Sequence, residues 1–297
     1  MNKISERMLE SLPVSAIKIR RLLVVVTHCI VDLRWRDRSV KVIQYGCQML
    51  IGYYGNILTK ELCTALACTR RTASNSRKAF WLIKTIAHIK NTIEMIDNGA
   101  LNDINNITAI MDTFEQILLG LYYYCENNIF FIRMGLLKFD EDYVDWWANL
   151  TWFGADTCCL IAAIIRVRNN NIERGNIKEQ LKHLNANRIT NTTSNDKNEE
   201  TDSTSSNSTP ASDVEDEKQV LIRRLDELNK KGFDLHLSLA IAVFELGVSI
   251  HYVNLLEKLI GRRLGDGPVG AMGVISSTLI LYEGYLKYQR LTPAVST

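Results

Sequence analysis

Apolar residues recur along the first half of the chain with the period of an α-helix. One stripe has members three or four positions apart: Val40, Ile43, Cys47, Leu50, Tyr54 and Ile57. A second stripe repeats this spacing: Ala79, Leu82, Ile86, Ile89, Ile93 and Ile96. Positions three and four apart share one face, so both stripes predict amphipathic helices. The period fits equally well a helix on a protein core and a helix on a membrane surface.

Polar stretches predict where these helices end. The segment TRRTASNS at 69–76 interrupts the pattern, and its serines and asparagine suit the cap of a helix covering 76–93. Asn98-Gly99 is a stop signal for that helix. A further helix is expected over 112–139.

Two segments are candidates for crossing a membrane. Residues 146–165 match the length of a spanning helix, although Asp156 lies inside them as a candidate pore-lining or paired residue. Residues 267–282 are slightly shorter and have a face of small residues, which in lipid lets helices approach closely: Gly267, Gly270, Gly273 and Ser277. The segment 218–265 between them predicts one or two helices with a break near Gly232.

An acidic tract rich in Asn, Ser and Thr separates the two candidate spans. Residues 185–217 hold eight acidic and two basic side chains and almost no large apolar ones. Such a composition cannot bury enough surface to offset the entropy of ordering. We therefore expect a flexible linker at 181–217 between helical regions at 1–180 and 218–297.

Composition narrows the class of protein. The chain has 297 residues, 46% of them hydrophobic and 23% charged, and a net charge of +2, which argues against a nucleic-acid partner. The seven cysteines show no C-x-x-C spacing, so no zinc site is expected. The chain also lacks a P-loop, an H-E-x-x-H motif and a nucleophile–base arrangement. We therefore expect an all-α protein that is no enzyme and takes no cofactor or metal, and the residues alone leave its association with a membrane open.

Four motifs, in order along the chain, resemble those of the peroxin eleven family of peroxisomal membrane-elongation proteins. The first is RDRSVKVIQYGCQML at 36–50, matched through Arg36, Asp37, Arg38, Lys41, Gln44 and Tyr45. The second is SRKAFWLIK at 76–84, in which Trp81 and Ile83 replace the Arg and Gly frequent in the family. The others are YYYCENNIFFIRMGLL at 122–137 and the glycine-rich tail at 267–285.

The resemblance implies a protein of the peroxisomal membrane that promotes elongation, proliferation and fission of the organelle. It implies self-association into homo-oligomers, binding to anionic lipids, and dynamin-type GTPases and tail-anchored adaptors as fission partners. A helix inserted into one leaflet would bend the membrane. Its inserting residues would be Arg77, Lys78, Ala79, Phe80, Trp81, Leu82, Ile83, Lys84, Ile86, Ile89, Lys90 and Ile93.

Two other functions stay open at this point. A channel for small metabolites in the same membrane would use Asp156 and the small-residue face of 267–282. A soluble helical bundle acting as an adaptor would instead place the apolar stripes in its core.

Overall fold

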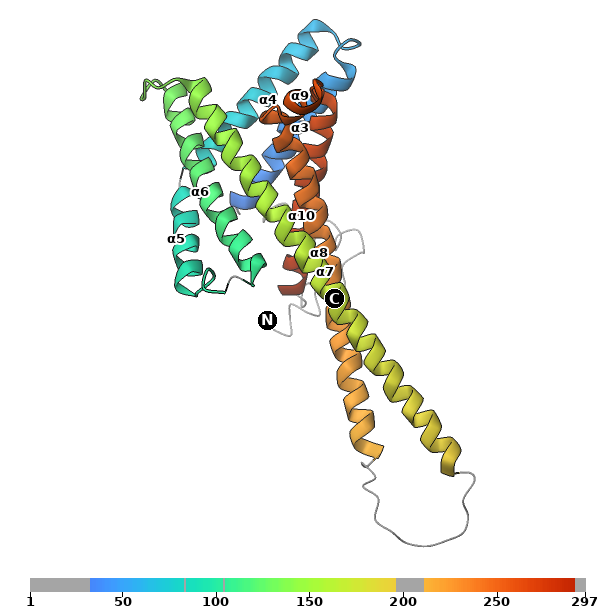
Figure 1. The fold of residues 1–297 in the computed structure, drawn as a ribbon. Helices are drawn as coiled ribbons and strands as arrows, with labels where there is room; N and C mark the ends of the chain where they lie inside the picture. The colour runs from blue at the N-terminus through green and yellow to red at the C-terminus, as the bar shows by residue number, and fades with distance from the viewer. Residues whose placement is uncertain (1–32, 83, 104, 196–210, 292–297) are drawn as a thin grey trace, which may run out of the picture. The chain divides into compact units, whose positions relative to one another are not determined.

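A computed structural model describes residues 33–82, 84–103, 105–195 and 211–291, in which every regular element is a helix (Figure 1). The all-α class predicted from the sequence is confirmed. The helices are α3 (Leu33–Tyr54), α4 (Lys60–Phe80), α5 (Lys84–Asp97), α6 (Ile107–Arg133), α7 (Glu141–Asn195), α8 (Ala211–Tyr252), α9 (Leu255–Ile260) and α10 (Asp266–Leu291).

The helices form two compact units. The second unit is Leu160–Ala240, and the first contains the rest of the described residues. The three regions expected from composition stay a prediction, although α7 continues to Asn195 and α8 already begins at Ala211, inside the expected linker. The remainder of the expected linker, 196–210, lies outside the described residues.

In the second unit α7 and α8 pair as an antiparallel hairpin. Asn170 on α7 donates to the carbonyl of Leu228 at 3.4 Å, and Glu173 accepts from Arg224 at 3.0 Å. The break expected near Gly232 is absent, because α8 continues through this position. A Cβ on Gly232 would lie 3.1 Å from Asn170 Nδ2, so the glycine makes room for the partner helix.

Within the described residues, three helices are long and apolar enough to cross a bilayer: α7 over Glu141–Ala186, α8 over Asp216–Tyr252 and α10 over Asp266–Arg290. The first and the third contain the segments predicted from the sequence. The candidate in α8 was missed, because the glycine at 232 was interpreted as a break and Glu245 interrupts the apolar run.

The single helix predicted over 76–93 is wrong, since α4 ends at Phe80 and α5 starts at Lys84. The indole of Trp81 is buried between Tyr122 and Tyr123, with ring centroids 5.9 and 5.4 Å away. These tertiary contacts fix a turn that local helix propensity would not predict. The boundary expected at 69–76 is also wrong, because α4 runs through that stretch.

The closest packing in the first unit joins α3 and α10. A Cβ on Gly52 of α3 would collide with the backbone of Gly267, and one on Gly270 with the backbone of Met49. A Cβ on Gly273 would collide with the ring of Tyr45. The small-residue face of α10 therefore lies against α3 of the same chain.

We expect Gly52→Ala to lower the free energy of unfolding by about 1–3 kcal/mol, because the added methyl group forces the two backbones apart. The matched control is Gly46→Ala on the same helix, where a Cβ meets no atom within 4 Å. The control should be neutral or stabilise by up to about 1 kcal/mol, because alanine favours the helix. Denaturant unfolding in detergent measures both variants, and equal effects would contradict this packing.

Candidate functional site

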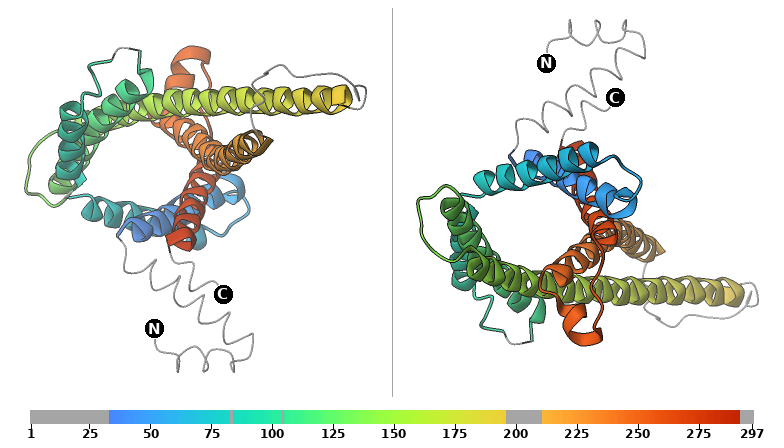
Figure 2. Two further views of the ribbon diagram at one scale, coloured as in Figure 1. Left: turned by 90° about the horizontal axis from the view of Figure 1, so that it is seen from below. Right: turned by 90° about the horizontal axis from the view of Figure 1, so that it is seen from above.

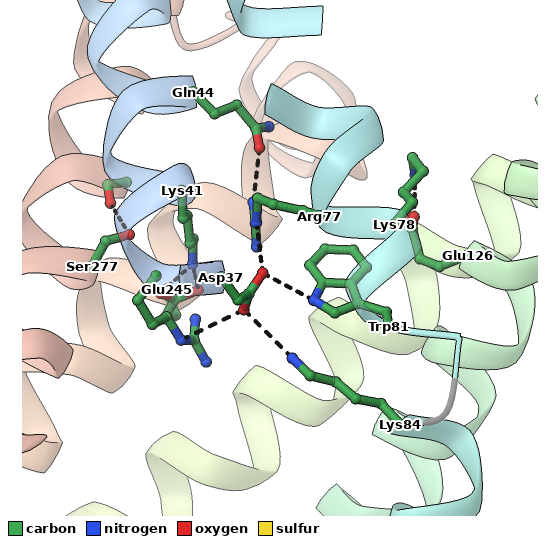
Figure 3. A network of polar contacts seen from close by, with 12 residues as sticks. Asp37, Lys41, Gln44, Arg77, Lys78, Trp81, Lys84, Glu126, Glu245 and Ser277 are labelled. Atoms are coloured by element: carbon green, nitrogen blue, oxygen red, sulfur yellow. Dashed lines mark hydrogen bonds and ion pairs between the residues drawn. The ribbon is translucent and has the colours of Figure 1, made fainter. Parts of the chain in front are cut away.

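Asp37, near the start of α3, is the centre of a buried polar cluster (Figure 3). Its Oδ1 accepts hydrogen bonds from Arg77 Nε on α4 at 3.1 Å and from the Trp81 indole at 3.0 Å. Its Oδ2 faces Lys84 Nζ on α5 at 3.4 Å and Arg38 Nε at 4.0 Å. One carboxylate thus joins α3, α4 and α5, and we call these five residues the Asp37 cluster.

Burial and neighbouring charges act in opposite directions on this carboxyl group. Burial alone would raise the pKa of Asp37, because it disfavours the charged form. The charges of Arg77, Lys84 and Arg38 outweigh burial and lower the pKa to about 2. Asp37 is therefore ionised at physiological pH, and the three helices are joined through its charge.

Two more ion pairs cross-link helices of the first unit (Figure 3). Lys41 Nζ, one turn after Asp37, contacts both carboxylate oxygens of Glu245 on α8 at 2.5 and 2.6 Å. Lys78 on α4 pairs with Glu126 on α6. Removing one partner of such a buried pair leaves an uncompensated charge, so each pair fixes the positions of its helices.

The side of α3 that faces the interior is polar. Asp37, Lys41, Gln44 and Gln48 are spaced four, three and four residues apart and are all buried. Arg77 Nη1 donates to Gln44 Oε1 at 2.8 Å, and Gln48 Nε2 donates to Asp266 Oδ1 at 2.9 Å. Most of the apolar stripe predicted for this helix is exposed, including Ile43, Leu50, Tyr54 and Ile57.

A cavity of about 1470 Å³ lies within the first unit and is lined by residues of α3 to α8 and of α10. Figure 2 shows the ribbon from two further sides. The lining of the cavity includes nine basic side chains: Arg38, Lys41, Arg70, Arg71, Arg77, Lys78, Lys84, Arg133 and Lys287. Seven acidic side chains also line it: Asp37, Glu115, Glu126, Asp145, Asp156, Glu245 and Glu283. Aromatic rings complete the wall: Trp35, Trp81, Tyr122, Tyr123, Trp152, Tyr252, Tyr288 and Tyr45.

Helix α5 turns polar side chains towards α6. His88 Nδ1 lies 2.8 Å from Gln116 Oε1, and Thr85 Oγ1 accepts from Asn127 Nδ2 at 3.2 Å. The apolar side chains of α5 point away from this contact and are 45–66% exposed: Ile86, Ile89, Ile93 and Ile96. We call these four residues the isoleucine stripe.

The neighbouring helices also expose apolar side chains. On α6 they follow the spacing three, four and three: Phe114, Ile117, Leu121 and Tyr124. The start of α7 adds a cluster rich in aromatic rings: Tyr143, Trp146, Trp147 and Leu150. A water-soluble monomer rarely exposes apolar patches this extensive, so the surface is suited to a membrane or to another protein.

Comparison with known proteins identifies the chain's relatives. The model of the family Peroxisomal biogenesis factor 11 (PEX11) matches residues 32–284. The chain belongs to this family. It is also similar to the Peroxisomal membrane protein 11 homolog of Dictyostelium discoideum, at 24% identity over 255 residues, which cover 85% of this chain and 90% of the relative. No solved structure matches the chain.

The resemblance noted from the four motifs is thus confirmed. Membership in the PEX11 family makes this chain a protein of the peroxisomal membrane with a part in peroxisome proliferation. The third function left open by the sequence, a soluble adaptor, would not be expected as a protein of this membrane.

In this PEX11-family protein, the residues predicted to insert into the membrane lie in different environments. Arg77, Lys78 and Trp81 are buried, and Lys84 lines the cavity. Phe80 is partly buried beneath the guanidinium of Arg36, at 5.7 Å. Ile83 lies outside the described residues. The other members are exposed: Ala79, Leu82, Ile86, Ile89, Lys90 and Ile93.

The other predicted residues of the PEX11-family chain gather in the first unit. The polar residues of the first motif face the interior, except Arg36, which is exposed. Gly267, Gly270 and Gly273 contact α3, and the buried hydroxyl of Ser277 donates to the carbonyl of Gly273 at 2.7 Å. Asp156 lines the cavity, and its Oδ2 has no hydrogen-bond partner among the described residues.

The sequence interpretation missed Glu126 and Glu245, the partners of the two buried lysines. A signal for them was present, because each is a lone acid within a largely apolar helical stretch. A charge in such a place needs a partner. The sequence could not identify which lysine each acid would meet, since the partners are 48 and 204 positions apart.

We expect Asp37→Asn to lower the free energy of unfolding by about 3–5 kcal/mol, because Arg77 and Lys84 lose their buried counter-charge. Asp97→Asn, the same change at an exposed position at the end of α5, is the control and should cost less than about 0.5 kcal/mol. Unfolding of the purified protein in detergent measures both.

The pH dependence gives this prediction a second readout. The lowered pKa of Asp37 contributes stability at pH values above the ordinary value of about 4, and this contribution is lost as the pH falls towards 2. The difference in stability between the native protein and Asp37→Asn should therefore shrink from pH 4 to pH 2. A difference that stays constant over this range would contradict a charged Asp37.

Proposed function

We propose that this protein bends the peroxisomal membrane through the isoleucine stripe of α5, and so promotes elongation and fission of the organelle without catalysing a reaction. The observation that carries this proposal is the orientation of α5, whose isoleucines face away from the protein while its polar side chains face α6. A helix that packed on a protein core would have the opposite orientation.

The length of α5 supports insertion into one leaflet. Its 14 residues extend for roughly 21 Å, which is shorter than the hydrocarbon core of a bilayer. An amphipathic helix of this kind lies in the plane of the membrane with its apolar face among the acyl chains. Because it occupies area in one leaflet only, it favours curvature.

Anionic lipids should contribute less to the membrane affinity of α5 than the basic side chains in the sequence would predict. Lys78 is paired with Glu126 in the interior, and Lys84 is directed to Asp37. Lys90 is exposed but lies 3.4 Å from Glu94 on the same helix. We therefore propose that burial of apolar surface supplies most of the membrane affinity of α5.

Self-association would need a surface other than the glycine face of α10, because α3 of the same chain covers that face. The exposed apolar side chains of α6 and α7 are available for contacts with a second copy. Homo-oligomers, dynamin-type GTPases and tail-anchored adaptors remain predictions from the resemblance.

The large cavity, with its many charged side chains, favours a second candidate function, a channel for small metabolites. Charged side chains line its interior, whereas the surface of the surrounding helices carries exposed apolar residues. A protein surrounded by lipid can hold such polar groups only where they pair or contact water.

Reconstitution into liposomes tests the proposed bending. We expect the triple change Ile86→Glu, Ile89→Glu and Ile93→Glu to abolish tubulation seen by electron microscopy, because charged side chains are costly in the acyl region. The protein should still co-float with the liposomes through its longer apolar helices. The matched control replaces the same three residues by Leu and should tubulate like the native protein. Tubulation by the Glu variant at the native level would contradict the proposal.

Recordings in planar bilayers test the channel. We expect the purified protein to give discrete conductance steps, and Asp156→Asn to change their size, because this carboxylate lines the cavity. The control is Asp97→Asn, which lies outside the cavity lining. A silent bilayer in the presence of correctly reconstituted protein would contradict conduction.

A further inference from the structure

The Asp37 cluster contains more positive than negative charge. One carboxylate is surrounded by three cations, on Arg38, Arg77 and Lys84. The charge of Glu245 also acts on Arg38, but this carboxylate is bound to Lys41, and Glu126 is bound to Lys78. Each of these two acids is matched by one lysine, so the excess remains. Charges removed from water without a counter-charge are unfavourable.

The rest of the cavity does not balance this excess. Nine basic and seven acidic side chains line it, so its total charge has the same sign as the cluster. Four acids of the lining remain: Glu115, Asp145, Asp156 and Glu283. Glu283 is paired with Lys287 at 2.7 Å, and Asp145 accepts from Asn149 at 2.7 Å. With all seven acids counted, nine basic side chains still leave the lining positively charged. The cavity as a whole is therefore suited to an anion.

Two side chains of the cluster have donors to offer such an anion. Lys84 Nζ and Arg38 Nε lie within 4.0 Å of the same oxygen, Asp37 Oδ2. An ammonium group has three donors and a guanidinium has five. The contacts to Asp37 use only some of these donors, so the others can bind a ligand. Both side chains line the cavity and keep 22% and 30% of their surface exposed, so a small ligand can reach them.

Burial, one opposite charge and two like charges act together on the pKa of Lys84. Burial lowers the pKa of Lys84 to about 8, and the charges of Arg38 and Arg77 also lower it, whereas Asp37 acts in the opposite direction. The rings of Trp81 and Tyr123, with centroids 5.5 and 5.1 Å from Nζ, give the cation partial compensation.

We propose that the Asp37 cluster is a binding site for a small anion that carries a carboxylate or phosphate group. The planar fork of Arg38 binds two oxygens of the group, and Lys84 binds the same group as a point charge. Arg77 holds Asp37 in place, and the rings of Trp81 and Tyr123 form the side of the site. This site requires neither membrane bending nor conduction, so it extends beyond both functions proposed above.

Binding of inorganic pyrophosphate tests the site directly. The probe is titrated calorimetrically, at constant ionic strength, into the full-length protein in nanodiscs of phosphatidylcholine. We expect binding by the native protein, and affinities about tenfold weaker for Lys84→Gln and for Arg38→Gln, since each loses a charge-assisted contact.

The matched control is Lys90→Gln, the same change on the same helix. Lys90 lies outside the cavity, with 72% of its side chain exposed, so this variant should bind like the native protein. Absence of binding by the native protein, or equal weakening by Lys84→Gln and Lys90→Gln, would overturn the proposal. Helix content and monodispersity establish that each variant is folded. If Lys84→Gln does not fold, the comparison of Arg38→Gln with Lys90→Gln tests the site.

A second set of nanodiscs identifies the source of the anion. Discs containing phosphatidic acid present the phosphate as a lipid headgroup, at the same probe concentrations. If the headgroup phosphate occupies the site, these discs should weaken pyrophosphate binding by the native protein and by Lys90→Gln to the same extent. The weakening should be smaller for Lys84→Gln. This result would assign the site to the headgroup. Unchanged binding would assign it to a soluble anion, and both results support the site.

Discussion

The structure of the first unit depends on one buried carboxylate. Asp37 accepts hydrogen bonds from Arg77 and Trp81 on the α4 side and faces Lys84 on α5, so it holds three helices at one point. Trp81 reaches Asp37 because the helix stops at Phe80, and this stop separates α4 from α5. The orientation of α5, from which the proposed membrane function follows, is therefore linked to the charge of a residue more than forty positions earlier in the chain.

Burying this polar cluster leaves the apolar residues outside. Helix α3 uses its polar face for contacts within the unit, and α5 uses its polar face for α6, so the isoleucine stripe is exposed. In water this arrangement would be unfavourable, because each large apolar side chain left exposed costs free energy. In a membrane the same surface would be solvated by acyl chains, while the charged side chains stay inside the first unit. Membership in the PEX11 family, whose matched relative is a peroxisomal membrane protein, agrees with this environment.

The sequence was sufficient to predict the all-α class, two of the three candidate spans found in the described residues, and the family. It was not sufficient to predict which face of each helix points inward, because the same spacing of three and four fits a stripe on a core and a stripe on lipid. The end of α4 at Phe80 escaped prediction because it results from contacts of Trp81 with residues distant in the chain. The helix through Gly232 was missed for a related reason, since the glycine provides space for Asn170 on another helix.

The most direct test of this account compares two neighbouring positions on α5 by spin labelling in liposomes. Ile89 belongs to the isoleucine stripe, whereas Asn91 lines the cavity of the first unit. With the native cysteines replaced, a label at position 89 should be relaxed mainly by oxygen, which concentrates in lipid. A label at position 91 should be relaxed mainly by a water-soluble nickel chelate. Equal accessibility at both positions, or the reverse order, would contradict a charged interior surrounded by an apolar, lipid-facing surface.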